Sequence, residues 1–303
     1  MLESRQSRRR GAFALTVLVG VVAATAATVA IAAGTLGDWP MGGQNINNTR
    51  AQDQSTIGVG NVGRLKVKWT ATLGGDVSST PAISGGAVYV TDWGEFEPSK
   101  IFSLGGSLTK LDAKTGGVLW TRRIDSYAGE PAGAVSRTSP VVADGVVYVG
   151  DQNGGHMLAI DAATGNLIWN TAIANPGPFT IITQSPIIHD GVLYFGAASL
   201  EELFVAFGAP CCSFRGSVQA LDAKTGAVKW TTYMTPATPA APDGYSGASV
   251  WGSTPALDPK SGTLYVTTGN NYSVPPDVEA GAPDDPANFV DSFVALDIKT
   301  GAV

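Results

Sequence analysis

The sequence predicts an all-β protein, a β-propeller made of four-stranded antiparallel blades. Three observations lead to this expectation: only 15% of the 303 residues are charged, the chain contains 38 glycines and 18 prolines, and two sequence phrases alternate along it. Little charge with abundant glycine and proline is typical of short strands joined by tight turns. A recurring unit of four short strands is the pattern of radial propellers, and no helical periodicity competes with it.

The first phrase opens each repeat. It places serine or threonine before a proline, continues with a short apolar run and a glycine turn, and ends in a second apolar run, as in TSPVVADGVVYV. This pattern predicts two antiparallel strands joined by a tight turn. The four copies begin at Ser79, Thr138, Gln184 and Ser253.

The second phrase closes each repeat with two further strands, as in ALDAKTGAVKW. We expect its aspartate to form the turn by bonding to its own backbone, rather than to act as a catalyst. We expect its tryptophan to pack between neighbouring blades, with the Thr-Gly turn hydrogen-bonded nearby. The aspartates are Asp112, Asp161, Asp222 and Asp297, and the tryptophans are Trp120, Trp169 and Trp230. We expect the same packing of Trp69, which lies before the first repeat in LKVKWTATL.

The last copy of the second phrase stops at Val303, before its tryptophan. In a closed propeller the last blade meets the first. A ring left open would expose an unpaired strand edge, which promotes aggregation. We therefore expect residues 34–303 to form a partial propeller of about four blades, roughly half of a larger ring.

Residues 1–33 predict a signal peptide or an N-terminal membrane anchor, because an arginine-rich start precedes an apolar run and small residues near Ala32. Either alternative places the rest of the chain in the periplasm or outside the cell, where a disulfide can persist. The leader carries a net charge of +3, so the remainder of a chain with net charge −6 carries −9. Such an acidic protein is a poor candidate for binding nucleic acid, and contact with a membrane is expected only through an uncleaved leader.

The two cysteines of the chain, Cys211 and Cys212, are adjacent in the sequence. Neighbouring Cα atoms lie about 3.8 Å apart across a trans peptide and about 2.9 Å apart across a cis one, whereas ordinary disulfides join Cα atoms about 4.4–6.8 Å apart. A bond between these two residues would close almost no loop and would add little stability. Two interpretations stay open: a reduced pair with one cysteine packed and one exposed, or a disulfide that serves function.

With these repeats in view, the chain resembles the quinoprotein alcohol dehydrogenases that use pyrroloquinoline quinone, and within them the polyvinyl alcohol dehydrogenase branch. The resemblance begins at GDWPMGGQNINNTRAQDQSTI and covers nearly everything after residue 37. In this family eight blades surround a quinone and a calcium ion, and a vicinal disulfide lies against the quinone ring. The resemblance therefore implies half of an eight-bladed propeller and a disulfide between Cys211 and Cys212, although here the pair follows the glutamate motif instead of preceding the arginine motif.

The resemblance also implies residues that contact the cofactor, in addition to Cys211 and Cys212. VSRTSP places Arg137 where the family has a cofactor-contacting arginine, and TIITQSP places Thr183 where a hydroxyl bonds the quinone carboxylates. SVWGSTPALDP places Trp251 where an indole stacks under the quinone. From the residues alone, Arg137 is equally a surface cation and Thr183 a strand threonine, whereas Trp251 lies outside the blade-packing phrase.

Calcium ligands and a catalytic base are implied in the same way. AASLEELF offers Glu202 as the calcium carboxylate, with Glu201 as the alternative, and YVTTGNNY offers Asn270 as an amide ligand. Carboxylate and amide oxygens suit a hard cation of this size. The base, also expected to bind the metal, is Asp285, and the alternatives in the same loop are Asp284 and Asp291.

The function implied is oxidation of an alcohol, of the secondary or polyvinyl alcohol type, with electrons passed to a cytochrome. Because the chain has no Cys-x-x-Cys-His haem motif, we expect this acceptor to be either a separate protein or encoded in sequence missing from this chain. The alternative is a non-catalytic envelope propeller that acts as a protein-binding scaffold. A nucleophilic hydrolase is disfavoured, because His156 and His189 have no evident serine or cysteine partner. Neither are these histidines expected to form a usual structural zinc site with the adjacent cysteines.

Overall fold

The structure is a computed structural model that describes residues 37–52, 55–95, 105–173, 179–237 and 244–303. Contacts divide the chain into two units, residues 1–30 and 31–303. The predicted leader, residues 1–33, lies outside the described residues. None of the helices in the described ranges is both long enough and apolar enough to cross a membrane.

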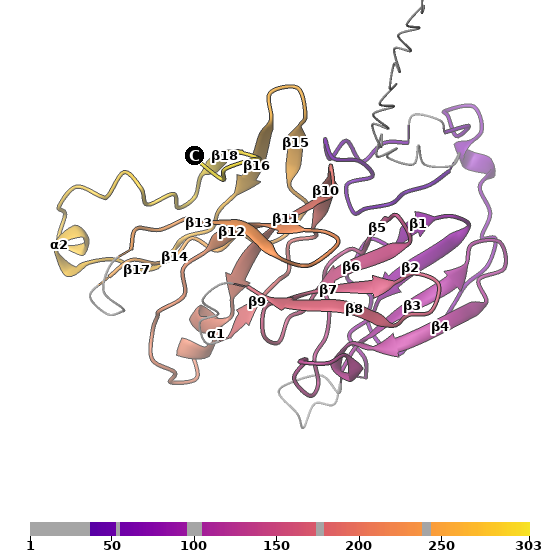
Figure 1. The fold of residues 1–303 in the computed structure, drawn as a ribbon, viewed down its shortest axis with the longest axis horizontal. Coiled ribbons are helices and arrows are strands. Elements are labelled where there is room, and N and C mark those ends of the chain that lie inside the picture. Colours follow the sequence, from indigo (N-terminus) through magenta and orange to yellow (C-terminus); the bar gives the residue numbers. More distant parts are fainter. Residues whose placement is uncertain (1–36, 53–54, 96–104, 174–178, 238–243) are drawn as a thin grey trace, which may run out of the picture. The chain divides into compact units, whose positions relative to one another are not determined.

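The first two repeats each form one four-stranded antiparallel sheet, with the strands hydrogen-bonded in sequence order (Figure 1). Each sheet consists of the two strands of the first phrase followed by the two strands of the second, as the sequence predicts. The first sheet contains β1 (Ala82–Ser84), β2 (Ala87–Thr91), β3 (Ser107–Asp112) and β4 (Val118–Arg123). The second contains β5 (Val141–Ala143), β6 (Val146–Gly150), β7 (His156–Asp161) and β8 (Leu167–Ala172).

The third and fourth repeats form the next two sheets, of which the third gains a strand from the segment before it. Its strands are β9 (Thr180–Ile181), β10 (Ile187–His189), β11 (Val192–Ser199), β12 (Ser217–Asp222) and β13 (Val228–Tyr233). The fourth sheet contains β15 (Ala256–Asp258), β16 (Thr263–Thr267) and β18 (Phe293–Asp297). The remaining elements are β14 (Ser246–Gly247), which pairs with β17 (Asn271–Ser273), and the short helices η1 (Val62–Arg64), η2 (Ile124–Ser126), α1 (Glu201–Val205) and α2 (Pro276–Glu279).

Trp69 and the three tryptophans of the second phrase each bond to the next blade, which confirms the prediction made for them. Each indole donates its N–H to the backbone carbonyl that follows the aspartate of the next repeat, for example Trp169 Nε1 to Ala223 O at 3.1 Å. The Thr-Gly turn of that repeat lies against the same ring: a Cβ on Gly226 would stand 2.8 Å from the Trp169 ring. The other three tryptophans bond to Ala113, Ala162 and Ile298 in the same way.

The aspartates of the second phrase are turn-formers, as predicted. Asp222 Oδ1 accepts hydrogen bonds from the backbone N–H groups of Lys224 and Thr225 and from the Thr225 hydroxyl. These bonds fix the turn between β12 and β13 and hold the pKa of Asp222 below its usual value, with the Thr225 hydroxyl as the largest cause. Asp112, Asp161 and Asp297 make the same set of bonds.

Hydroxyls of the first phrase link the segments that lead into the first strand of each blade. The backbone N–H of Thr80 donates to Ser139 Oγ at 2.9 Å, and the N–H of Ser139 donates to Ser185 Oγ at 2.8 Å. The N–H of Ser185 continues the series by donating to the Ser253 carbonyl. In the same region β5 contacts both β1 and β10. The polar segments before the first strands therefore lie side by side.

The opening segment, residues 39–50, crosses these same strands. Trp39 pairs with Ile83 in β1, the carbonyl of Pro40 accepts the N–H of Val142 in β5, and the carbonyl of Ile46 accepts the N–H of Leu257 in β15. One short segment thus ties the first, second and fourth blades together. Met41 of this segment belongs to a buried apolar cluster that also includes Phe195, Leu193 and Met234.

Candidate functional site

A cavity of about 310 Å³ lies where the opening segment meets the segments that precede β1, β5, β10 and β15. Most of its lining residues have polar side chains, and two are glycines, where a ligand can approach the backbone closely. Three of the residues predicted to contact a cofactor, Arg137, Thr183 and Trp251, come together here from three different repeats. The full lining consists of Gly42, Arg50, Ser78, Thr80, Arg137, Ser139, Thr183, Ser185, Trp251, Gly252, Ser253 and Thr254.

The charge of this cavity is positive. Its described lining contains two arginines, Arg50 and Arg137, and no aspartate or glutamate. Arg50 donates to Ser253 Oγ at 3.0 Å, and the Arg137 guanidinium carbon lies 4.7 Å from the centre of the Trp93 ring. Neither arginine forms an ion pair with a residue in the described part of the chain. The two guanidinium groups are therefore available to an anionic ligand.

Trp251 differs from the tryptophans that pack between blades. It is 61% exposed and lies in the cavity lining, whereas Trp120 is only 8% exposed. Gly269 lies beside it, and a Cβ on this glycine would stand 3.1 Å from Trp251 Nε1. An exposed indole face next to two cations suits a planar aromatic ligand that carries negative charge.

The predicted calcium ligands Glu202 and Asn270 are brought together from distant parts of the sequence. Glu202 is in α1 and Asn270 precedes β17, and Asn270 Nδ2 donates to Glu202 Oε1 at 3.2 Å. Both side chains are exposed. Asn270 directly follows Gly269, so this pair lies next to the residue that contacts Trp251. A carboxylate and an amide side by side can offer two oxygen ligands to a cation once the amide turns.

Glu201, the alternative ligand, has a different role. Its side chain is buried, and its carboxylate accepts hydrogen bonds from the backbone N–H groups of Ser213 and Phe214 and from the Ser213 hydroxyl. These bonds fix the segment directly after Cys212 against α1. Glu201 therefore has few lone pairs left for a metal, whereas Glu202 faces Asn270.

Cys211 and Cys212 form a disulfide with their Cα atoms 3.1 Å apart. Cys212 is buried and Cys211 is exposed, and the Sγ atom of Cys211 lies 3.7 Å from the Tyr272 carbonyl oxygen. The disulfide therefore lies beside the segment that carries Asn270. Neither cysteine is among the described residues that line the cavity.

The three candidate bases are held in one loop by different contacts. The Tyr245 hydroxyl donates to Asp284 Oδ1 at 2.7 Å, which lowers the pKa of Asp284, and accepts the backbone N–H of Asp285. The carboxylate of Asp285 accepts the N–H of Ala287, and within the described ranges it has no hydrogen bond to Glu202 or Asn270. The backbone N–H of Asp291 donates to the Gly269 carbonyl, beside Asn270.

Arg50 is a functional candidate that the sequence reasoning did not select. Its position in the cavity depends on the path of the opening segment, and this path is set by backbone pairing with β1, β5 and β15. The only local signal was its place within the opening motif that carries the family resemblance.

Comparison with known proteins agrees with this architecture. A family model described as the outer membrane protein assembly factor BamB matches residues 65–210. A second, described as the β-propeller domain of glucose, ethanol and alcohol dehydrogenases, matches residues 174–303. Both describe quinoprotein-type repeats, and together they span every blade in the structure.

Curated relatives and solved structures point the same way. The chain is 31% identical over 275 residues to polyvinylalcohol dehydrogenase of a Pseudomonas species, covering 88% of this chain and 39% of that protein. It is 29% identical over 287 residues to polyvinylalcohol dehydrogenase of Sphingopyxis sp. strain 113P3, covering 89% and 39%. Against the crystal structure of quinohemoprotein alcohol dehydrogenase from Comamonas testosteroni the TM-score is 0.66 at 26% identity, covering 88% and 40%.

The chain thus spans about two fifths of the length of the relatives it matches. Two observations lead to the same assignment. The blades are held by repeated tryptophan and aspartate hydrogen bonds, and the similarity to these enzymes covers nearly nine tenths of the chain. By sequence and fold the chain is a quinoprotein-type β-propeller that is similar to the quinoprotein alcohol dehydrogenases.

Proposed function

We propose that this chain carries part of the quinone and calcium site of an alcohol dehydrogenase, in which the cavity between Arg137 and Trp251 binds pyrroloquinoline quinone. The observation that carries the proposal is the convergence of Arg137, Thr183 and Trp251 on one cavity whose described lining holds two arginines and no carboxylate. The substrate is an alcohol of the secondary or polyvinyl alcohol type.

The residues of the cavity fit the quinone chemically. Pyrroloquinoline quinone is a flat aromatic ring system with three carboxylates, so it needs cations, hydroxyl donors and an aromatic face. Arg50 and Arg137 supply the cations, Thr183 and Ser185 supply hydroxyls, and the exposed ring of Trp251 supplies the face. A carboxylate in the lining would repel such a ligand, and the described lining has none.

The pair of Glu202 and Asn270 fits a calcium ion. Both side chains offer oxygen, the ligand type that calcium takes, and both are exposed, so water can complete the shell. Asp285 is proposed as the third ligand and the base by resemblance to the family. When bound in this cavity, the quinone would supply an acceptor for the hydride of the alcohol carbon, and calcium at Glu202 and Asn270 would supply a Lewis acid.

The chain's own side chains then orient the reactants and move one proton. Arg137 and Thr183 hold the cofactor by its carboxylates, and Trp251 fixes the plane of its ring. The carboxylate of Asp285 takes the hydroxyl proton of the alcohol as general base. We also propose that the chain is exported by its leader and that a c-type cytochrome accepts the electrons.

Equilibrium titration of the chain with pyrroloquinoline quinone, followed by the absorbance of the quinone with calcium or with a calcium chelator, tests this function. We expect saturable binding that Trp251→Ala and Arg137→Gln each weaken by at least tenfold, because they remove the aromatic face and a charge-assisted pair. Glu202→Gln should abolish the difference between calcium and chelator while quinone binding itself remains.

Matched controls separate these effects from general damage. Arg64→Gln removes an exposed arginine in η1, and Phe293→Ala removes an aromatic ring that is 91% exposed in β18. Both lie outside the cavity lining and should leave the quinone affinity unchanged. Equal weakening by Arg64→Gln and Arg137→Gln would show that the quinone responds to net charge alone and would refute the proposed site.

The second candidate function is a protein-binding scaffold of the bacterial envelope. It is favoured by the match of residues 65–210 to a model described as an outer membrane assembly factor. A scaffold does not require arginines without ion pairs beside an exposed indole. If the chain is a scaffold, we expect it to fold but not to bind the quinone in the titration above.

A further inference from the structure

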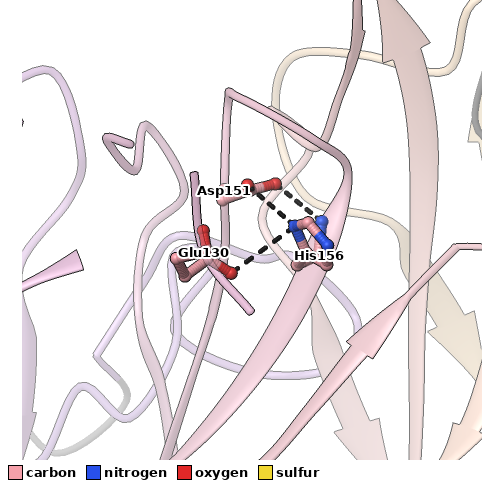
Figure 2. A group of neighbouring side chains, drawn as sticks. All are labelled: Glu130, Asp151 and His156. Carbon is pink, nitrogen blue, oxygen red and sulfur yellow. Dashed lines mark hydrogen bonds and ion pairs between the residues drawn. The ribbon is translucent and has the colours of Figure 1, made fainter. Parts of the chain in front are cut away.

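A cluster of three titratable side chains lies apart from the cavity. Glu130 is in the connection between the first and second blades, and Asp151 and His156 bound the loop that joins β6 to β7 (Figure 2). One ligand-type atom from each residue lies within 4.8 Å of the others. Figure 2 shows the two carboxylates and the imidazole pointing toward one another.

The two carboxyl groups in this cluster are fully removed from solvent. The side chains of Glu130 and Asp151 are each 0% exposed, and that of His156 is 19% exposed. Two ionised carboxylates in such a place repel each other and lose their hydration, so a positive charge or a proton must lie between them. Arg123, at the end of β4 where the connection that carries Glu130 begins, is paired with Asp125.

Hydrogen bonding within the protein leaves the cluster incomplete. Asp151 accepts the backbone N–H of His156 and lies 3.1 Å from His156 Nδ1 through its other oxygen. Asn170 Nδ2 donates to Glu130 Oε1, but Glu130 Oε2 is buried and has no hydrogen-bond partner. A single N–H on His156 Nδ1 cannot satisfy both carboxylates. Glu130 Oε2 therefore has no hydrogen-bond donor among the described residues.

The spacing of the three groups matches that around a small metal ion. His156 Nδ1 lies 3.1 Å from Asp151 Oδ2 and 3.5 Å from Glu130 Oε1. Two ligands of a tetrahedral zinc ion, with bonds of about 2.0–2.1 Å, lie about 3.3 Å apart. The observed distances bracket this value. The partial exposure of His156 leaves access for a water molecule as the fourth ligand.

The loop that carries the site is built closely around these groups. The N–H of Asp151 donates to the His156 carbonyl, which closes the loop on itself. A Cβ on Gly154 would stand 2.7 Å from His156 Cε1 and 2.9 Å from Nδ1, so a glycine is needed for the imidazole to occupy this position.

We propose that Glu130, Asp151 and His156 bind one divalent transition-metal ion, with zinc as the best fit, at a site separate from the quinone cavity. An imidazole nitrogen with two carboxylates favours zinc over calcium, which takes six to eight oxygen ligands. The ion would join the connection between the first two blades to the β6–β7 loop. The carbonyl of Asp151 also accepts the N–H of Ile182, which precedes the cavity residue Thr183.

Metal titration of the full chain, stripped with a chelator and free of quinone, tests this site. We expect one tightly bound zinc ion per chain, measured by competition with a chromophoric chelator. Cobalt in place of zinc should give the intense visible absorption of a tetrahedral site, and excess calcium should not displace it. At zinc concentrations about 100-fold above the Kd, the melting temperature should rise by about 5–10 °C.

Variants locate the ion. Glu130→Gln and His156→Gln should each lower the zinc affinity by at least 100-fold, and Glu130→Gln keeps the shape of the protonated side chain, so the fold is retained. His189→Gln changes the other histidine and Glu202→Gln changes the proposed calcium ligand, and both should bind zinc as the unmodified chain does. Equal zinc affinity in His156→Gln and the unmodified chain, or displacement of cobalt by calcium, would overturn the proposal. Because no quinone is present, the outcome is independent of the proposed alcohol dehydrogenase function.

Discussion

Arg137 is held in the cavity by a contact that leaves its charge free. Its guanidinium group lies over the ring of Trp93, and the Trp93 indole N–H donates to Ser78 Oγ at 2.7 Å. The ring is thereby fixed by a residue that itself lines the cavity. Stacking restricts the arginine without neutralising it, so the side chain is already oriented for a carboxylate ligand.

Replacement of Trp93 by leucine should weaken quinone binding about two- to fivefold, because an exposed cation–π contact contributes about 0.5–1 kcal/mol. The calcium dependence of binding should not change, since within the described part of the chain Trp93 bonds to Ser78, and Glu202 bonds to Asn270. Equilibrium titration of the quinone measures both effects. An affinity equal to that of the unmodified chain would show that the stacking does not position Arg137.

Individual site residues could be predicted from the sequence only where a local motif carried them. Arg137, Thr183 and Trp251 each lie in a short phrase that resembles the family, and the structure brings all three to one cavity. Arg50 enters through the path of a segment that crosses three blades, which no local pattern reveals. The cluster of Glu130, Asp151 and His156 was likewise hidden, because Glu130 reaches it from another blade connection.

At the scale of strands and turns, the aspartate of each second phrase fixes the hairpin that ends the blade. Asp222 and its three counterparts each accept two backbone N–H bonds and one threonine hydroxyl. All four have a pKa below the usual value, and in each case the threonine hydroxyl is the largest cause. A folded-state pKa below the unfolded one means that these turns add stability above the unfolded pKa and lose it as the pH falls.

The free energy of unfolding should therefore decrease as the pH is lowered through about 4, the ordinary pKa of an aspartate. Asp222→Asn should destabilise the chain at pH 7 and make its stability less sensitive to pH in this range, because the amide cannot carry the charge that the three donors stabilise. Urea unfolding at pH 7 and at acidic pH measures this. A larger pH dependence in Asp222→Asn than in the unmodified chain would contradict the account.

Two tryptophans of similar chemistry should respond differently to the same change. Trp169→Phe removes the hydrogen bond from the indole N–H to the Ala223 carbonyl. This carbonyl still accepts a hydrogen bond from the Tyr148 hydroxyl. The free energy of unfolding should therefore fall by about 1 kcal/mol. Trp251→Phe should change stability by less than about 0.5 kcal/mol, because Trp251 is 61% exposed. Urea unfolding of both variants measures these two losses of unfolding free energy. A larger loss in Trp251→Phe than in Trp169→Phe would contradict the assignment of Trp169 to blade packing.

The four-stranded repeat could be predicted from the sequence because each strand is bounded by its own signal. Proline precedes the first strand, a glycine turn divides the first two, and the Asp-x-x-Thr-Gly turn divides the last two. The added strand β9 and the pair of β14 and β17 carry no such signal. Their pairing depends on which segments tertiary packing places side by side.

Across the described unit as a whole, the opening segment couples blade packing to the cavity. Residues 39–50 contact three blades and contribute Gly42 and Arg50 to the cavity lining. Gly42 is needed because a Cβ there would stand 2.9 Å from Ser139 Cβ and 3.0 Å from Thr254 Oγ1. The segment and the cavity wall therefore fit only if this position has no side chain.

Gly42→Ala should lower the unfolding free energy by about 1–3 kcal/mol and weaken quinone binding at the same time, because the added methyl group displaces Ser139 or Thr254. Gly58→Ala is the matched control, since a Cβ at this position has no neighbour within 4 Å. It should leave both properties unchanged. If Gly42→Ala lowered the stability but kept the quinone affinity, the opening segment would not couple blade packing to quinone binding.

The most direct test of the central claim is the position of the quinone in a crystal structure of the chain grown with pyrroloquinoline quinone and calcium. We predict its carboxylates at Arg137 and Thr183, its ring against Trp251, and calcium at Glu202 and Asn270. Quinone bound elsewhere on the chain, with Arg137 and Trp251 free of it, would contradict the proposed function.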